Sequence, residues 1–213
     1  MVLPPMERDH SCRTPGNDAG RERNRSIDHM SKATDIADDM EALVGQERYW
    51  GPTPGALYEW ATDPTMGHEA LGGSEETFVN CFGLPMLLAV RRGFLSKPSV
   101  KRILGDTLKR GDAKAKAFST AWNRAVWTDW KAVPGAAWRP ARGDLVFFEN
   151  FVGGLLNHVA VSTGKTSFLG HSEVISFGEG REAIGRARVN RTSIELLRQE
   201  GHTSVRFLTP TWD

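Results

Sequence analysis

Cys81 is the residue of this chain best placed to do nucleophilic chemistry. A thiol attacks as its thiolate, and a helix N-terminus favours that anion because unpaired N–H groups and the helix dipole lower the thiol pKa. Asn80 is a good helix-capping residue, and Phe82, Met86 and Val90 follow at helical spacing. The pattern predicts a helix that begins near Cys81 with the sulfur at its N-terminus. The alternative is that Cys81 is a core residue, since cysteine is among the most buried residue types.

His158 could supply the base that such a thiol needs. It lies 77 positions after Cys81 and opens an alternating segment, residues 158–162, that predicts a β-strand. In a cysteine hydrolase an imidazole takes the thiol proton and returns it to the leaving group. We therefore predict that Cys81 and His158 meet as a thiolate–imidazolium pair. A single histidine on a strand can also be structural.

A third polar group should hold the far nitrogen of the imidazole. The next predicted strand, residues 173–177, offers Glu173 and Ser176, and His171 precedes it. If this strand pairs antiparallel with the previous one, alternation puts Glu173 and Ser176 on opposite faces, and the sequence leaves open which face looks at His158. We favour Glu173 as the third catalytic residue because a carboxylate fixes the tautomer and stabilises the imidazolium. His171 is the rival.

The elements that must position these residues predict an α+β fold. Helical spacing begins at Ser31 and returns near Cys81, Pro98–Trp130 is helix-like with a break near Gly111, and a loop is expected from Pro52 to Gly73. The later segments are strands at 144–148, 158–162, 173–177 and 204–208, with a short capped helix at 193–199. Helices followed by strands favour an antiparallel sheet packed on helices. Residues 1–30 show no apolar periodicity, so we expect a disordered tail before one domain over 31–213.

Three segments resemble the NlpC-like branch of the papain-fold cysteine peptidases. They are residues 80–84 (Asn-Cys-Phe-Gly-Leu), 142–148 (Arg-Gly-Asp-Leu-Val-Phe-Phe) and 157–161 (Asn-His-Val-Ala-Val), in the order of the family motifs. The resemblance covers about residues 80–177. The chain departs from the family pattern at Pro85, and its long interval between cysteine and histidine holds a basic helical insertion.

The resemblance implies both a fold and an activity. The fold would be a papain-like core with N-terminal helices packed on an antiparallel sheet. Cys81 would be the nucleophile, His158 the base, and the third polar residue would lie on the strand that holds Glu173. The implied substrate is an amide bond of a peptidoglycan peptide, and the implied activity is that of an endopeptidase or amidase.

Composition and net charge argue against several other classes of function. The 213 residues suit one domain, and the formal net charge of +1 gives no strong pull towards nucleic acid or acidic membranes. The longest apolar runs, such as residues 84–90, are far shorter than the roughly 18 residues of a membrane span. Only Cys12 and Cys81 are cysteines, and the histidines are scattered, so we expect no disulfide framework, no metal site and no cofactor.

The start of the chain bears on localisation and partners. Residues 1–24 hold no apolar signal core, so we expect synthesis in the cytoplasm without a signal peptide. A peptidoglycan substrate would then require delivery by a dedicated secretion system, as for a bacterial effector. The expected partners are the peptide or peptidoglycan substrate and an immunity or secretion protein.

Charge is distributed unevenly along the chain. Residues 31–80 carry ten acidic and two basic side chains, a balance of −8, whereas residues 91–143 carry thirteen basic and three acidic ones, a balance of +10. We expect these segments to face each other or to be solvated. The alternative is that the basic segment meets an anionic polymer such as a membrane surface or teichoic acid.

Two other functions remain open from the sequence. The acyl group on Cys81 could pass to an amine or alcohol, which would make the protein a transglutaminase, deamidase or acyltransferase. Alternatively, the fold could serve as a binding module in which Cys81 is inert. Slow alkylation of Cys81 at neutral pH would favour the inert module, because it would exclude a lowered thiol pKa.

Overall fold

The computed structural model describes residues 31–51, 55–72, 77, 79–108, 133–134, 139–150, 156–178, 185–200 and 202–212. The predicted tail over 1–30 lies outside the described residues. The same is true of the predicted helical material over 109–130, and therefore of most of the basic insertion.

Within the described chain, seven strands form one antiparallel sheet with the order β1-β6-β5-β4-β3-β7-β2. Their bounds are β1 Glu47–Trp50, β2 Val133–Pro134, β3 Leu145–Asn150, β4 Leu156–Thr166, β5 Ser172–Phe177, β6 Gly185–Ser193 and β7 His202–Thr209. The three central strands β3, β4 and β5 are consecutive in sequence and adjacent in space. The prediction of an antiparallel sheet in an α+β fold is confirmed.

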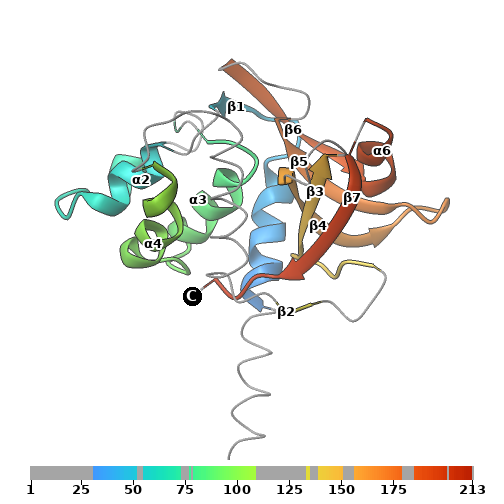
Figure 1. Cartoon of the computed structure of the whole chain (residues 1–213), viewed down its shortest axis with the longest axis horizontal. Helices are drawn as coiled ribbons and strands as arrows, with labels where there is room; N and C mark the ends of the chain where they lie inside the picture. The colour runs from blue at the N-terminus through green and yellow to red at the C-terminus, as the bar shows by residue number, and fades with distance from the viewer. Residues whose placement is uncertain are drawn as a thin grey trace, which may run out of the picture.

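The helices cover both faces of this sheet. They are residues 31–42, α2 Gly55–Thr62, the 3-10 helix η1 His68–Leu71, α3 Gly83–Arg91, α4 Lys97–Leu108 and α6 Ile194–Gln199. Figure 1 shows helix 31–42 and α2 to α4 on one side of the sheet and α6 on the other. None of the described helices is both long enough and apolar enough to cross a bilayer.

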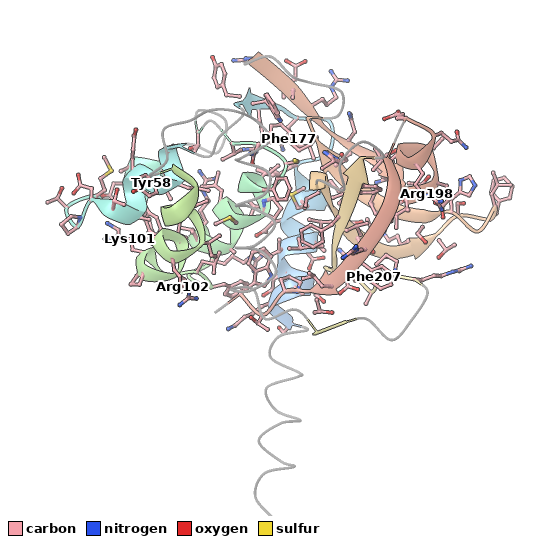
Figure 2. All side chains as sticks on the ribbon, in the orientation of Figure 1. Tyr58, Lys101, Arg102, Phe177, Arg198 and Phe207 are labelled. Carbon is pink, nitrogen blue, oxygen red and sulfur yellow. The ribbon has the colours of Figure 1, made fainter. Side chains whose placement is uncertain are left out.

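Successive side chains of the central strands point alternately into two separate apolar clusters. Leu145 and Phe147 of β3 belong to the large cluster between the sheet and the helices, whereas Val146 and Phe148 belong to a small cluster under α6. Phe177 of β5 also lies in the large cluster, where side chains fill the space between helices and sheet (Figure 2). Because side chains of a strand point alternately to its two faces, any residue of β3, β4 or β5 can be assigned to one cluster by its position.

The prediction of a loop from Pro52 to Gly73 is wrong. Residues 55–62 form α2, which buries Leu57, Trp60 and Ala61 at spacings of three and four. Strand β1 before this segment was also not predicted. Strand β1 ends at Trp50 and α2 begins at Gly55, so the described residues on either side of 52–54 belong to two short elements.

The acidic and basic segments meet where helix 31–42 packs on its neighbours. Arg92 donates to Asp39 at 2.6 and 2.8 Å, and Arg142 donates to Glu41 at 2.8 Å and to Asp38. These contacts confirm, for the described residues, that the two oppositely charged segments face each other. The hydrogen bonds of Glu41 with Arg142 and Lys165 lower the pKa of its carboxyl to about 2.

Candidate active site

Cys81 lies in the turn that leads into α3. The Asn80 side-chain oxygen accepts a hydrogen bond from the Gly83 N–H at 2.8 Å. The Asn80 backbone carbonyl accepts another from the Leu84 N–H at 3.0 Å. The helix starts at Gly83, so Pro85 falls in the first turn, where a missing N–H removes no intrahelical bond. The predicted helix after Cys81 is confirmed, with Asn80 as the capping side chain.

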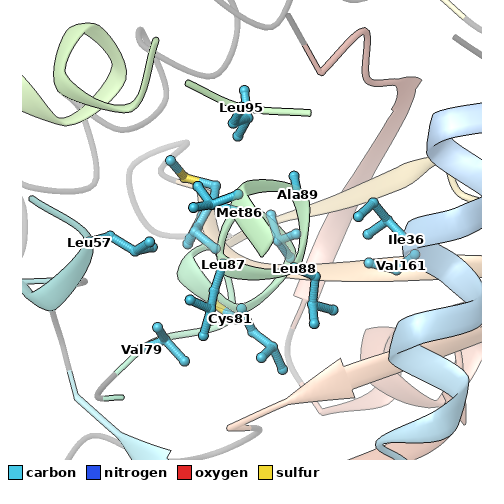
Figure 3. Close-up of a cluster of buried hydrophobic side chains, with 14 of the residues drawn as sticks. Ile36, Leu57, Val79, Cys81, Met86, Leu87, Leu88, Ala89, Leu95 and Val161 are labelled. Carbon is cyan, nitrogen blue, oxygen red and sulfur yellow. The ribbon is translucent and has the colours of Figure 1, made fainter. Parts of the chain in front are cut away.

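Backbone amides surround the Cys81 sulfur. Hydrogen bonds from the N–H groups of Val159, Phe82 and Cys81 itself each lower the thiol pKa. Burial has the larger and opposite effect, because the residue is 7% exposed among apolar side chains such as Val79 and Leu87 (Figure 3). The net result raises the pKa of the thiol to about 11. The prediction of a lowered pKa is therefore wrong for this structure, since loss of solvation outweighs the amide donors.

The contact with Val159 locates the sulfur relative to the sheet. Ser162 of β4 makes both of its backbone bonds, at 2.8 Å each, with the chain that leads into β3. Backbone groups of alternate residues in a strand face alternate neighbours, so the N–H of Val159, three positions earlier, faces β5. Pairing of β4 with β5 ends at Ala160 and Ser176. The sulfur therefore lies on the β5 side of β4, where the pairing of these strands stops.

His158 reaches the same point of the sheet from β4. Its ring Nε2 is 2.6 Å from the Ser176 hydroxyl, on the neighbouring strand β5, and its ring packs against Phe148 with centroids 5.8 Å apart. His158 is 5% exposed and Ser176 is fully buried. By alternation the imidazole lies on the face of Ala160 and Phe148, whereas Val159 faces the large cluster that contains Cys81.

Cys81 and His158 therefore lie at the same end of β4 but on different faces of the sheet. The amide that bonds the Cys81 sulfur belongs to the residue directly after His158. The predicted thiolate–imidazolium pair is not formed in this structure, because a thiol with a pKa of about 11 stays protonated at neutral pH and the ring Nε2 is engaged with Ser176.

Glu173 does not hold the His158 ring, and that prediction is wrong. The β4–β5 register pairs Val174 with Ser162, and the Thr163 hydroxyl donates to the Glu173 carbonyl, so Glu173 lies five positions along β4 from His158. At about 3.3 Å per residue this is roughly 16 Å. The Glu173 carboxylate instead accepts a bond from Arg191 at 2.8 Å. The rival His171 lies still further along the connection that precedes β5.

The sequence also offered Ser176 on this strand, although Glu173 was favoured as the third catalytic residue. Alternation had placed it on the face opposite Glu173, and the register shows that its face is the one shared with His158. The signal that could have selected it is the position of the β4–β5 turn, which fixes the register.

Trp50 of β1 contacts two segments next to the candidate site. It forms a bridge with Val79, two residues before Cys81, and its indole lies against Gly178 at the end of β5. A Cβ atom on Gly178 would be 2.2 Å from the indole Nε1, and Gly178 has a φ of +77°. Both features require glycine at this position.

Within the described ranges, no three His, Cys, Asp or Glu side chains gather closely enough to hold a metal ion. Comparison of the chain with protein-family models, with curated proteins and with solved structures finds no match.

Proposed function

We propose that the protein is a papain-like cysteine hydrolase that cleaves an amide bond of a peptidoglycan peptide, with Cys81 as nucleophile and His158 as base. The observation that carries this proposal is the proximity of the Val159 backbone amide, next to His158 in the chain, to the Cys81 thiol, whose pKa this amide lowers. This contact joins the helix start and the strand that supply the two reactive groups. The three amide donors around the sulfur also form a site suited to negative charge.

The raised thiol pKa determines when the proton moves. Because the resting thiol is neutral, His158 must accept its proton as the sulfur attacks the carbonyl carbon. This step requires the ring to bring its Nδ1 to the sulfur from the other face of the sheet, past the point where β4–β5 pairing ends. Ser176 is the group that would orient the ring through Nε2.

The remaining steps follow from the same groups. Attack forms an S–C bond and a tetrahedral oxyanion, which the Cys81 N–H helps to stabilise. The imidazolium then returns its proton to the leaving nitrogen as the C–N bond breaks, which leaves a thioester on Cys81. Water, deprotonated by His158, hydrolyses the thioester and regenerates the thiol.

The peptidoglycan substrate rests on the family resemblance of the three motif segments. The test is to incubate purified sacculi with the full chain and to identify the released muropeptides by mass spectrometry. We expect the wild-type chain to cleave a stem-peptide or cross-bridge amide and Cys81→Ala to release nothing. Deamidated or cross-linked protein glutamines with intact muropeptides would instead favour the transferase.

A second candidate, a binding module with an inert thiol, is favoured by one observation. The sulfur is buried and its pKa is raised to about 11, as for a core cysteine. This candidate predicts that Cys81→Ala and His158→Gln leave every measured property except stability unchanged. Loss of muropeptide release in a folded Cys81→Ala protein would exclude it.

A further inference from the structure

The turn that joins β4 to β5 is closed by hydrogen bonds and is apolar at its tip. Residues 167–170 form a β-turn in which Gly170 N–H donates to the Ser167 carbonyl at 2.9 Å. Ser167 N–H donates to the His171 carbonyl at 2.9 Å, and the Ser167 hydroxyl accepts from the His171 N–H at 3.2 Å. Gly170 has a φ of +81°, as the position after such a turn often requires. These hydrogen bonds close the turn at its base and fix which residues stand at its tip.

Two large apolar side chains occupy the centre of the turn. Phe168 is 96% exposed and Leu169 is 64% exposed, so neither contributes to a core. Central turn positions usually carry Gly, Pro, Asn, Asp or Ser. In Figure 1 the connection between β4 and β5 reaches out from the body of the molecule, on the side of the sheet where α6 lies. Folding therefore does not explain the apolar pair at this tip.

The base of the tip is cationic. Lys165 is 57% exposed, and Arg139 donates to the Thr166 hydroxyl at 3.2 Å. No carboxylate occurs in residues 163–172. Two acidic side chains close to this segment are already engaged, since Glu173 accepts from Arg191 at 2.8 Å and Glu195 accepts from the Ser172 N–H at 3.0 Å. Lys165 is paired with Glu41 at 2.9 Å, so its charge is partly neutralised, and Arg139 is the second cation at the base of the tip.

We propose that this tip is a membrane-docking element that inserts Phe168 and Leu169 into the surface of an anionic lipid bilayer. Apolar side chains enter the boundary between headgroups and acyl chains, while Lys165 and Arg139 remain at the level of the anionic headgroups. A soluble polyanion would engage the cations but would leave the apolar pair in water. A protein partner is disfavoured by area, because two side chains supply far less than the roughly 800 Å² that each side of a stable protein interface buries.

The docking element is independent of the proposed hydrolase. His158 and Thr166 are eight residues apart on β4, which corresponds to roughly 26 Å between the candidate active site and the base of the tip. A protein bound through the tip would therefore keep the site of Cys81 away from the bilayer surface. Failure of either proposal leaves the other intact.

The test is co-sedimentation of the full chain with 100 nm vesicles of phosphatidylcholine, with and without phosphatidylglycerol. We expect binding to the anionic vesicles that weakens with added salt, and at least tenfold weaker binding to neutral vesicles. The double variant Phe168→Ser/Leu169→Ser should lose at least tenfold in affinity. The control Leu196→Ser removes the 47% exposed leucine of α6 and should bind as the wild type does.

Two variants that each remove one positive charge, one at the tip and one far from it, complete the experiment. Lys165→Gln should weaken binding several-fold and reduce its salt dependence, whereas Lys101→Gln, on α4 on the opposite side of the molecule (Figure 2), should change neither. Circular dichroism and thermal unfolding check that each variant is folded. The proposal is overturned if the wild-type chain does not bind anionic vesicles, or if the folded double variant binds them as the wild type does.

Discussion

Burial and backbone hydrogen bonding shift the pKa of the Cys81 thiol in opposite directions. Three backbone N–H groups favour the thiolate, whereas the apolar surroundings favour the thiol and have the larger effect. An activated cysteine in a resting ion pair would have the opposite balance. The amide donors are therefore more useful once negative charge develops during the reaction than in the resting protein.

The pH dependence of alkylation tests this balance. With a folded pKa of about 11 against an ordinary value of 9.0, the thiolate fraction at neutral pH is about 100-fold lower than in an unfolded chain. We expect the iodoacetamide rate of Cys81, followed by peptide mass spectrometry, to rise tenfold per pH unit up to about pH 11. The chain in urea is the control, with a midpoint near pH 9. A folded-state midpoint below 9 would contradict the balance derived from burial.

Ser176 is predicted to position His158 rather than to react. Ser176→Ala removes the bond to Nε2 inside a buried site, so we expect about 1–3 kcal/mol of destabilisation in urea unfolding. For the proposed hydrolase, kcat should fall at least tenfold with KM nearly unchanged, and Ser176→Thr should restore part of it. Ser99→Ala, another buried serine, is the control for stability and should leave kcat unchanged. A Ser176→Ala protein with full kcat would show that the serine is only structural.

At the scale of elements, the end of β5 is fixed by the contact between Gly178 and Trp50. Gly178→Ala adds a methyl group 2.2 Å from the indole Nε1 and forces alanine to a φ of +77°. Gly93 separates the two effects, because its φ is +72° but a Cβ there meets no atom within 4 Å.

We therefore expect Gly93→Ala to cost about 1–2 kcal/mol in thermal or urea unfolding, from backbone strain alone. Gly178→Ala should cost at least 1 kcal/mol more, since the steric conflict adds to the strain. Equal losses in the two variants would mean that the indole moves aside freely, and the packing of Trp50 against Gly178 would then not fix the end of β5.

Helix 31–42 is held on the sheet partly by the ion pairs of Glu41. Because its folded pKa is about 2 against an ordinary 4.5, this carboxylate stabilises the fold above pH 4.5, and the contribution is lost as the pH falls towards 2. Such partly exposed pairs contribute about 1 kcal/mol or less each. Urea unfolding should show Glu41→Gln to be less stable than the wild type at pH 7 and equal to it near pH 2. A difference that persists at pH 2 would assign the effect to packing instead.

The elements that the sequence predicted well are those with a strong internal period. Strands β3, β4 and β5, the helix after Asn80 and the helix capped by Ser193, whose hydroxyl accepts the Leu196 N–H at 3.2 Å, lie where the patterns indicated. Strand β6 was missed because Ala187 and Val189 are its only buried apolar residues and stand between polar and charged neighbours. Helix α2 was missed because flanking prolines and glycines dominated a short segment.

For the candidate site, residue identity was more predictable than geometry. Cys81 and His158 could be found because each opens an element with a clear period, and the fold places them at one gap between β4 and β5. The third residue depended on the strand register, and the state of the thiol depended on burial by distant segments. Neither quantity is encoded in the local pattern around the residue.

On the scale of the whole molecule, β4 connects two regions with different proposed roles. Its first residues include His158 and Val159, whose amide contacts the Cys81 thiol, and its far end leads into the exposed turn with Phe168 and Leu169. A rigid strand between them keeps the two regions apart. The membrane-docking proposal can therefore be tested with vesicle binding alone, and the hydrolase proposal with activity alone.

The most direct test of the central claim, that Cys81 is the nucleophile, is to capture its acyl-enzyme. The full chain is mixed with purified sacculi, quenched in acid and mapped by peptide mass spectrometry. The account predicts a stem-peptide acyl group on the peptide that contains Cys81, and neither adduct nor released muropeptides from Cys81→Ala. Muropeptide release by the Cys81→Ala protein, or a wild-type chain that gives neither adduct nor release, would contradict it.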